Sequence, residues 1–240
     1  MKWNKVTWYS KLIALILFVV LPFVGFYLGI QYGENLVLGN RSVTIVSSSG
    51  QSGAGTGAAY YSNTAEWQTD MRSEADAGFT IAYPIDFTAD DNYSAAPVTD
   101  WRLNASSTPG TKFLTITIPS AFDPQTNFAD ATLTVGASAS NAAIANCLTP
   151  DPTGGPAATP ASTTINGVPF TVFSSADAGA GNYYETTSYR TTHAGECWAV
   201  EYTIHSSQIG NYPPSYDLQV FDQSMIQGVL DRMVGTFKFQ

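Results

Sequence analysis

The residues of this chain that could perform nucleophilic or acid–base chemistry gather in one stretch, Thr192 to Ser206, which reads THAGECWAVEYTIHS. The stretch holds both histidines of the chain, His193 and His205, and Cys197, one of its two cysteines. A cysteine nucleophile needs a histidine base within hydrogen-bond reach of its thiol. The same side chains could also ligate zinc, which takes four ligands in a tetrahedral arrangement. The stretch therefore raises two hypotheses, a Cys–His reaction centre and a metal site.

The spacing inside this stretch favours a half-buried strand over either site. From Trp198 to Ile204 every second residue is apolar or aromatic, and the residues between them are mostly polar. Such alternation is typical of a strand with one face in the core and the other in solvent. His205 is then expected on the polar face with Glu201, while His193 falls in the preceding turn. Since no oxyanion-hole motif or metal-ligand spacing accompanies them, we expect no catalytic residue and no metal ligand here.

The two cysteines, Cys147 and Cys197, are instead predicted to form a disulfide. Cys147 ends a short predicted helix and Cys197 begins the strand, so that a bridge would close a span of fifty residues. Closing such a loop is worth on the order of 4 kcal/mol at best. The alternative is two separately buried thiols that behave as small apolar side chains. A bridge would require an oxidising compartment.

Other motifs that could bind ligands are incomplete. Residues Asp86 to Asn92 offer oxygen ligands for Ca²⁺ but lack the D-x-[DN]-x-[DN]-G pattern of a calcium loop. The glycines near Gly53 follow no predicted strand, which excludes a phosphate-binding loop, and we expect no cofactor. Several tyrosines flank predicted turns and could line a ligand or partner surface, or cap the ends of a sheet's core. These tyrosines are Tyr183, Tyr184, Tyr189, Tyr212 and Tyr216.

An uncharged apolar run from Leu12 to Ile30 is predicted to be a transmembrane helix. Its nineteen residues span about 28 Å at about 1.5 Å per residue, close to the thickness of the hydrocarbon layer. Lys2, Lys5 and Lys11 precede the run, which places residues 1–11 in the cytoplasm and the rest of the chain outside it. The alternative is a cleaved signal peptide, but no small-x-small cleavage site follows the run. We therefore predict a single-pass protein of the cell membrane.

The residues after this run divide into a linker, 31–66, and one extracytoplasmic domain, 67–240. The linker contains the Ser/Gly-rich stretch Ser47 to Ala58, which is typical of flexible coil. Seven basic and nineteen acidic residues follow Ile30, a net charge of 7 − 19 = −12. A surface of that charge repels phosphate backbones, so a nucleic-acid partner is excluded.

The domain itself combines strands and helices. Residues 78–87 and 112–119 alternate as strands do, with Pro84 suited to a strand end. Asn166-Gly167 predicts a tight hairpin, and a second turn is expected at Ala194-Gly195. A short helix begins after Ser138 or Ser140, and apolar residues recur at helical spacing from Leu218 to Val234, followed by a short closing strand. This order predicts an α+β domain with an antiparallel sheet packed by α-helices.

The stretches GFTIAYPIDF (78–87), INGVPFTVF (165–173), CWAVEYTIHS (197–206) and GVLDRMVGTFKF (228–239) together resemble the PsbP-like family. This is the fold of the photosystem II extrinsic subunit and of a Ran-binding factor. The resemblance covers residues 78–239 and implies an α/β/α sandwich. Members of the family mostly serve as binding or assembly modules. None of the four stretches matches a ligand-contacting motif, so the resemblance assigns no functional residue.

Two classes of function follow from these observations. The first is a membrane-anchored extracytoplasmic module, without catalytic activity, that binds a protein or a small ligand. The second is a cell-surface hydrolase whose catalytic residues are dispersed along the chain. Because the chain has only two histidines, and neither lies in a catalytic motif, the first is favoured.

Overall fold

The computed structural model describes residues 64–72, 78–91, 97–103, 108–151 and 160–240, together with Lys11, Leu17, Phe18, Val20 and Leu21. The chain falls into two units, Met1–Ser52 and Gly53–Gln240. Most of the predicted transmembrane helix (12–30) and of the linker (31–66) lies outside the described residues. Among those described, no helix combines the length and the hydrophobicity that crossing a membrane requires.

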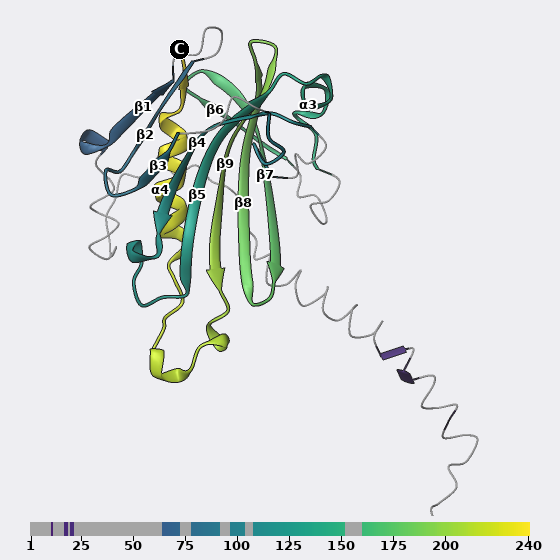
Figure 1. The fold of residues 1–240 in the computed structure, drawn as a ribbon, viewed down its shortest axis with the longest axis vertical. Helices are drawn as coiled ribbons and strands as arrows, with labels where there is room; N and C mark the ends of the chain where they lie inside the picture. Colours follow the sequence, from purple (N-terminus) through teal and green to yellow (C-terminus); the bar gives the residue numbers. More distant parts are fainter. Residues whose placement is uncertain are drawn as a thin grey trace, which may run out of the picture. The chain divides into compact units, whose positions relative to one another are not determined.

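The second unit is rich in strands, as the alternating sequence predicts, and its described residues contain two α-helices (Figure 1). The strands are β1 (Gln68–Arg72), β2 (Phe79–Tyr83), β3 (Thr88–Asp90), β4 (Thr111–Pro119), β5 (Phe128–Ser138), β6 (Ala161–Ile165), β7 (Val168–Gly179), β8 (Asn182–His193), β9 (Glu196–Ser207) and β10 (Lys238–Phe239). The helices are α3 (Asn141–Asn146) and α4 (Gln223–Thr236), with 3-10 turns η1 (Thr64–Glu66), η2 (Ser120–Phe122), η3 (Ile209–Asn211) and η4 (Pro214–Tyr216).

The strands form two antiparallel sheets. A seven-stranded sheet has the order β3-β4-β5-β9-β8-β7-β6, and a three-stranded sheet has the order β1-β2-β10. Helix α4 packs against β9 and β6 of the large sheet and against β2 of the small one. The predicted α+β architecture, an antiparallel sheet packed by helices, is therefore present.

The main core lies between α4 and the large sheet. On β9 the inward residues are those that the alternation predicted, Trp198, Val200, Tyr202 and Ile204, and all are buried. The other face was wrongly expected in solvent, because Ala199 and Glu201 are buried as well, at 1% and 7% exposed. Ile226, Leu230 and other apolar residues of α4 complete this core. A fully buried apolar side chain contributes about 1.5–3 kcal/mol, so this alternation fixes which face of β9 meets the helix.

Helix α4 begins later than its apolar spacing predicts. Asp222 accepts hydrogen bonds from the backbone N–H groups of Ser224 (3.0 Å) and Met225 (3.1 Å) and so caps the helix, which starts at Gln223. Leu218 therefore lies before the helix, in an extended segment. The apolar spacing continues across this boundary, but the capping carboxylate determines where the helix begins.

The predicted turns are confirmed. Asn166 and Gly167 join β6 to β7 with φ of +47° and +84°, and Ala194-Gly195 joins β8 to β9 with φ of +50° and +80°. The Asn166 side chain also donates to the carbonyl of Phe237, 2.7 Å away, which ties the hairpin to the end of α4. Strand β2 ends immediately before Pro84, since proline has no N–H group to continue the ladder.

Candidate functional site

Residues Thr192 to Ser206 form the end of β8, the turn at Ala194-Gly195 and nearly all of β9. His193 ends β8, and its ring stacks on Phe239 with 3.8 Å between the ring centroids. His205 lies near the other end of β9, on the face opposite the core. The two histidines are therefore separated by nearly the full length of the strand. The structure does not bring them together into one site.

Cys147 and Cys197 are joined by a disulfide, with 5.5 Å between their Cα atoms, so the predicted pairing is present. The bond connects the end of α3 to the start of β9. Both cysteines are fully buried in a small second core with Trp101, Ala143 and Ala199. This core lies on the face of the large sheet away from α4. Since Cys197 is bonded, it offers no thiol for nucleophilic catalysis.

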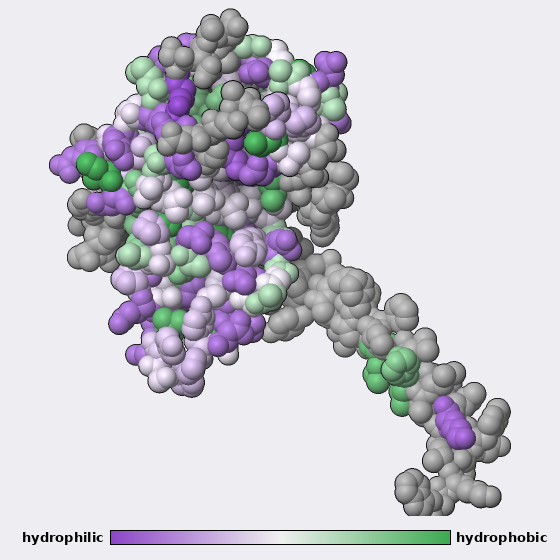
Figure 2. All heavy atoms as spheres, viewed as in Figure 1, coloured by the Kyte–Doolittle hydropathy of each residue, from purple (hydrophilic) through white to green (hydrophobic). Residues whose placement is uncertain are grey.

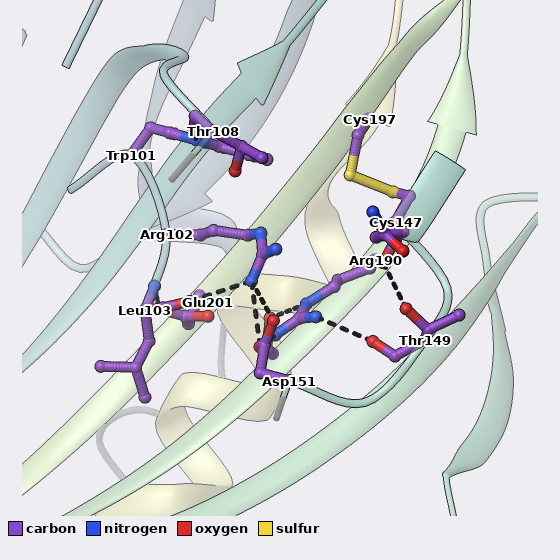
Figure 3. A network of polar contacts seen from close by, with 12 residues as sticks. Trp101, Arg102, Leu103, Thr108, Cys147, Thr149, Asp151, Arg190, Cys197 and Glu201 are labelled. Atoms are coloured by element: carbon purple, nitrogen blue, oxygen red, sulfur yellow. Dashed lines mark hydrogen bonds and ion pairs between the residues drawn. A yellow bond between two sulfur atoms is a disulfide. The ribbon is translucent and has the colours of Figure 1, made fainter. Parts of the chain in front are cut away.

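A buried network of charged side chains lies beside the disulfide (Figure 3). Asp151 accepts hydrogen bonds from Arg102, at 3.0 Å to each carboxylate oxygen, and it also pairs with Arg190. The side chain of Glu201 accepts from the backbone N–H of Leu103 at 2.7 Å. Arg102, Arg190 and Glu201 are only 6%, 2% and 7% exposed.

Burial dominates the electrostatics of this network. It raises the pKa of the Glu201 carboxyl, an effect that the hydrogen bond from Leu103 and the neighbouring arginines offset only in part. It also lowers the pKa of Arg190, with a further contribution from the positive charge of Arg102. Arg102 Nε and Glu201 Oε2 are buried without a hydrogen bond in the described part of the chain. The network fastens the segments that contain Arg102 and Asp151 to β8 and β9, which is a structural role.

A second group of residues lies at the opposite end of the large sheet and is exposed. It contains four of the five tyrosines singled out from the sequence, together with Val220. The exposed fractions of these five side chains range from 37% to 74%. The fifth tyrosine, Tyr189, lies elsewhere, where its hydroxyl donates to Asp231 of α4. We call this surface the tyrosine end; it comprises Tyr183, Tyr184, Tyr212, Tyr216 and Val220. In Figure 1 this end lies where β8 begins and β9 ends, with the loop that follows β9, and Figure 2 shows the same region mostly in shades of intermediate hydropathy.

Three chain segments build the tyrosine end, and backbone hydrogen bonds lock them together. The N–H of Gln208 donates to Gly181 in the β7–β8 turn at 2.8 Å. The N–H of Ser207 donates to Asn127 at 2.9 Å, and that of Asn127 donates to Gln219 at 3.0 Å. Residues 208–221 contain only short 3-10 turns, yet these bonds hold them to the sheet. The tyrosines are therefore presented on an ordered surface.

The tyrosine rings are themselves held in place. The hydroxyl of Tyr212 donates to Ser207 Oγ at 3.0 Å, and the Tyr212 and Tyr216 rings lie 6.1 Å apart. Tyr184 stacks on His205 with 4.5 Å between centroids. Aromatic side chains fixed in this way lose little conformational entropy when a partner covers them.

His205 has both ring nitrogens occupied. Nδ1 lies 3.0 Å from Asp130 Oδ2, and Nε2 lies 2.9 Å from the side-chain oxygen of Asn182. Among the described residues, no serine, threonine or cysteine side chain is bonded to either nitrogen. His205 therefore lacks the base-to-nucleophile contact of a hydrolase and instead holds Tyr184 in place.

The acidic stretch that follows Asp86 provides no metal site within the described residues. Asp91 pairs with Arg72 at 2.6 Å, and Asp90 belongs to β3. The described part of the chain contains no group of three His, Cys, Asp or Glu side chains placed to hold a metal ion.

Comparison with solved structures shows a distant likeness. No protein-family model matches the chain, and no curated protein matches it. The chain is similar to the crystal structure of LpqN, which is involved in cell envelope biogenesis of Mycobacterium tuberculosis, at 10% identity and a TM-score of 0.41 over 72% of this chain and 91% of that one. A likeness of this size indicates a distant structural relation and carries no argument about function. The PsbP-like resemblance stays a prediction.

Proposed function

We propose that the domain formed by residues 67–240 is a non-catalytic, extracytoplasmic binding or assembly module that contacts a protein partner through the tyrosine end. The observation that carries this proposal is the clustering of four exposed tyrosines and Val220 at one end of the sheet. Tyrosine is enriched in protein interfaces because its ring buries a large apolar area while its hydroxyl keeps a polar contact.

The order of this surface supports the proposal. Hydrogen bonds from Gln208, Ser207 and Asn127 hold its segments, and Tyr212 and Tyr184 are fixed by Ser207 and His205. Binding energy is then not consumed in ordering a loop. Isolated exposed apolar residues are ordinary, whereas several exposed aromatic residues at one end of a sheet favour an interaction surface, although the consecutive Tyr183 and Tyr184 lie on opposite faces of β8.

The disulfide supports the proposed location outside the cytoplasm. Disulfides such as Cys147–Cys197 persist where the compartment is oxidising and are rare where thiols are kept reduced. The lysines that precede Leu12 favour the same orientation, with residues 12–30 as the membrane anchor. The hydrolase alternative has less support, because His205 and Cys197 are both already engaged.

A photo-crosslinking amino acid placed at Tyr216 of the full chain in intact cells tests the proposal. We expect a discrete covalent adduct with one protein, which mass spectrometry of the adduct identifies. The matched control carries the same amino acid at Met71, an equally exposed residue in the small sheet, and is expected to give no such adduct.

The identified protein is then purified and titrated with the full chain in neutral detergent. Changing Tyr212 and Tyr216 to serine is expected to weaken binding at least about tenfold, since aromatic anchors dominate such interfaces. Unchanged affinity, or adducts of equal yield from both crosslinker positions, would exclude the tyrosine end as the binding surface.

A further inference from the structure

The tyrosine end is acidic, and almost none of that charge is neutralised. Residues 119–131, 177–185 and 205–223, all of them described, contain six carboxylates and no lysine or arginine. Of the six, only Asp130 has an ion-pair partner among the described residues, the ring of His205, which carries a charge only when it is protonated. The remaining five have no ion pair with a described Lys, Arg or His; they are Asp123, Asp177, Glu185, Asp217 and Asp222.

The basic residues lie away from this end. Within residues 64–240 the described lysines and arginines belong to the sheets near their other end, to the segment before β4 that contains Arg102, and to the later turns of α4. Four of them are paired with carboxylates there, so they do not offset the charge of the tyrosine end. They are Arg72, Arg102, Lys112, Arg190, Arg232 and Lys238. The domain therefore has one end with uncompensated negative charge.

Uncompensated charge at a binding surface selects the charge of the partner. Placing like charges together costs free energy, and this disfavours a second copy of the same acidic end, an anionic lipid surface or a nucleic acid. A cationic partner is attracted from a distance and paired on contact. The charge of the surface is thus complementary to a basic protein segment.

The carboxylates lie beside the tyrosines. Asp177 is the cross-strand partner of Tyr184, and Asp217 follows Tyr216 in the chain. A guanidinium group can lie on a tyrosine ring and bond a carboxylate with its edge at the same time, which an ammonium group does less well. Tyr184 and Asp177 face one another across β7 and β8 and suit that combination, and Asp217 adds a second carboxylate next to Tyr216 in the chain.

We propose that the tyrosine end binds an arginine-bearing basic segment of another protein, with Asp177 and Asp217 as its main ionic contacts. This inference rests on the proposed function and names the chemistry of the partner. The tyrosine rings provide the contact area, and the carboxylates select the charge.

The test uses the full chain in neutral detergent and a synthetic nonapeptide, (Gly-Arg-Ser)₃, with (Gly-Glu-Ser)₃ as the charge-reversed control. We expect the arginine peptide to bind, with an affinity that falls as salt rises, and the glutamate peptide not to bind. Isotope-edited spectra are expected to place the peptide at the tyrosine end. Absence of arginine-peptide binding, or equal binding of the two peptides, would overturn the inference.

Two double variants with the same change of net charge locate the binding. Asp177→Asn/Asp217→Asn alters the tyrosine end, and the latter change suits a backbone φ of +47°, which asparagine tolerates well. Asp100→Asn/Glu196→Gln alters the other end, where Asp100 meets Lys112 and Glu196 opens β9. We expect about a tenfold loss of peptide affinity in the first variant and less than twofold in the second.

The remaining outcomes separate this inference from the proposed function. Equal losses in both double variants would mean that only net charge matters, which overturns the inference. If the crosslinked partner depends on Tyr212 and Tyr216 but not on Asp177 and Asp217, the tyrosine end is an interface without the basic preference. Self-association of the full chain that buries Tyr216 would also overturn the inference, because the partner of the tyrosine end would then be a second copy of this chain.

Discussion

Asp151 pairs with two buried arginines, Arg102 and Arg190. Removing one partner of a buried ion pair leaves the other charge unpaired in the protein interior, which costs about 3–5 kcal/mol. We therefore expect Asp151→Asn to lower the free energy of unfolding by that amount, as measured by chemical denaturation. The matched control is Asp100→Asn, whose carboxylate is 70% exposed beside Lys112.

The exposed pair is expected to contribute less than about 1 kcal/mol. If Asp151→Asn and Asp100→Asn lowered the free energy of unfolding equally, the buried network around Asp151 would contribute no more to stability than an exposed ion pair.

Glu201 makes stability depend on pH in a defined direction. Burial raises the pKa of its carboxyl in the folded protein above the ordinary value of 4.5, which applies to the unfolded chain. At a pH between the unfolded and the folded pKa, the folded protein therefore binds more protons than the unfolded chain. Its contribution to stability is therefore complete below pH 4.5 and is lost as pH rises through the raised pKa. In Glu201→Gln this dependence is absent, and the free energy of unfolding of the native protein is expected to fall relative to the variant as pH rises.

The measurement is denaturation of both proteins at several pH values from 4.5 upward, with a limiting slope of about 1.4 kcal/mol per pH unit for one group. This account of Glu201 would be contradicted if the difference in free energy of unfolding between the two proteins did not change with pH. It would also be contradicted if the native protein became more stable relative to the variant as pH rises.

At the scale of elements, local patterns predicted most of what the structure contains. The alternation from Trp198 to Ile204, the Asn166-Gly167 hairpin and the short helix after Ser140 all depend on neighbours in the chain. The start of α4 was predicted too early because apolar spacing continues back to Leu218, whereas the helix begins after the Asp222 cap. Boundaries depend on capping contacts that periodicity does not register.

The sites were less accessible to sequence reasoning. Arg102, Asp151, Arg190 and Glu201 meet although up to 99 positions separate them, since 201 − 102 = 99. No local pattern predicts that meeting, which depends on strand order and on the covering segment that contains Trp101. The tyrosines were found from their positions at turns, but sequence left open whether they form a surface. In the structure four of them are at least 37% exposed, and their role as a partner surface stays a proposal.

The disulfide holds α3 against the start of β9, where it fills a small core with Trp101. Because the bond joins residues fifty positions apart, it restricts the unfolded chain strongly. We expect Cys147→Ala/Cys197→Ala to lower the free energy of unfolding by about 2–4 kcal/mol. The variant is compared with the native protein by denaturation in the presence and absence of reductant.

Reductant is expected to lower the free energy of unfolding of the native protein to about that of the variant. The variant's own free energy of unfolding is expected not to change. Two alkylated thiols in native protein isolated without reductant would show that the bond does not form in the cell.

At the scale of the whole molecule, charge is segregated along the chain. Three lysines precede Leu12, and all nineteen acidic residues follow Ile30. This segregation predicts the orientation of the proposed membrane anchor, since basic residues are retained on the cytoplasmic side. With that orientation we expect the proposed binding surface outside the cytoplasm, on a domain that follows a Ser/Gly-rich segment.

The topology that we expect is therefore one membrane crossing, with Met1 inside and residues 67–240 outside. Protease added to intact cells or protoplasts is expected to release a fragment that contains the tyrosine end, because the composition of Ser47 to Ala58 predicts flexible coil, which proteases cleave readily. Deleting residues 1–30 is expected to abolish membrane retention, because about 28 Å of apolar helix is then lost. A cytoplasmic protein probed in the same samples controls for lysis. A domain that stays protected while the membrane is intact, or a mature N-terminus between Gly25 and Asn40, would replace the uncleaved anchor with a different topology or with a cleaved signal peptide.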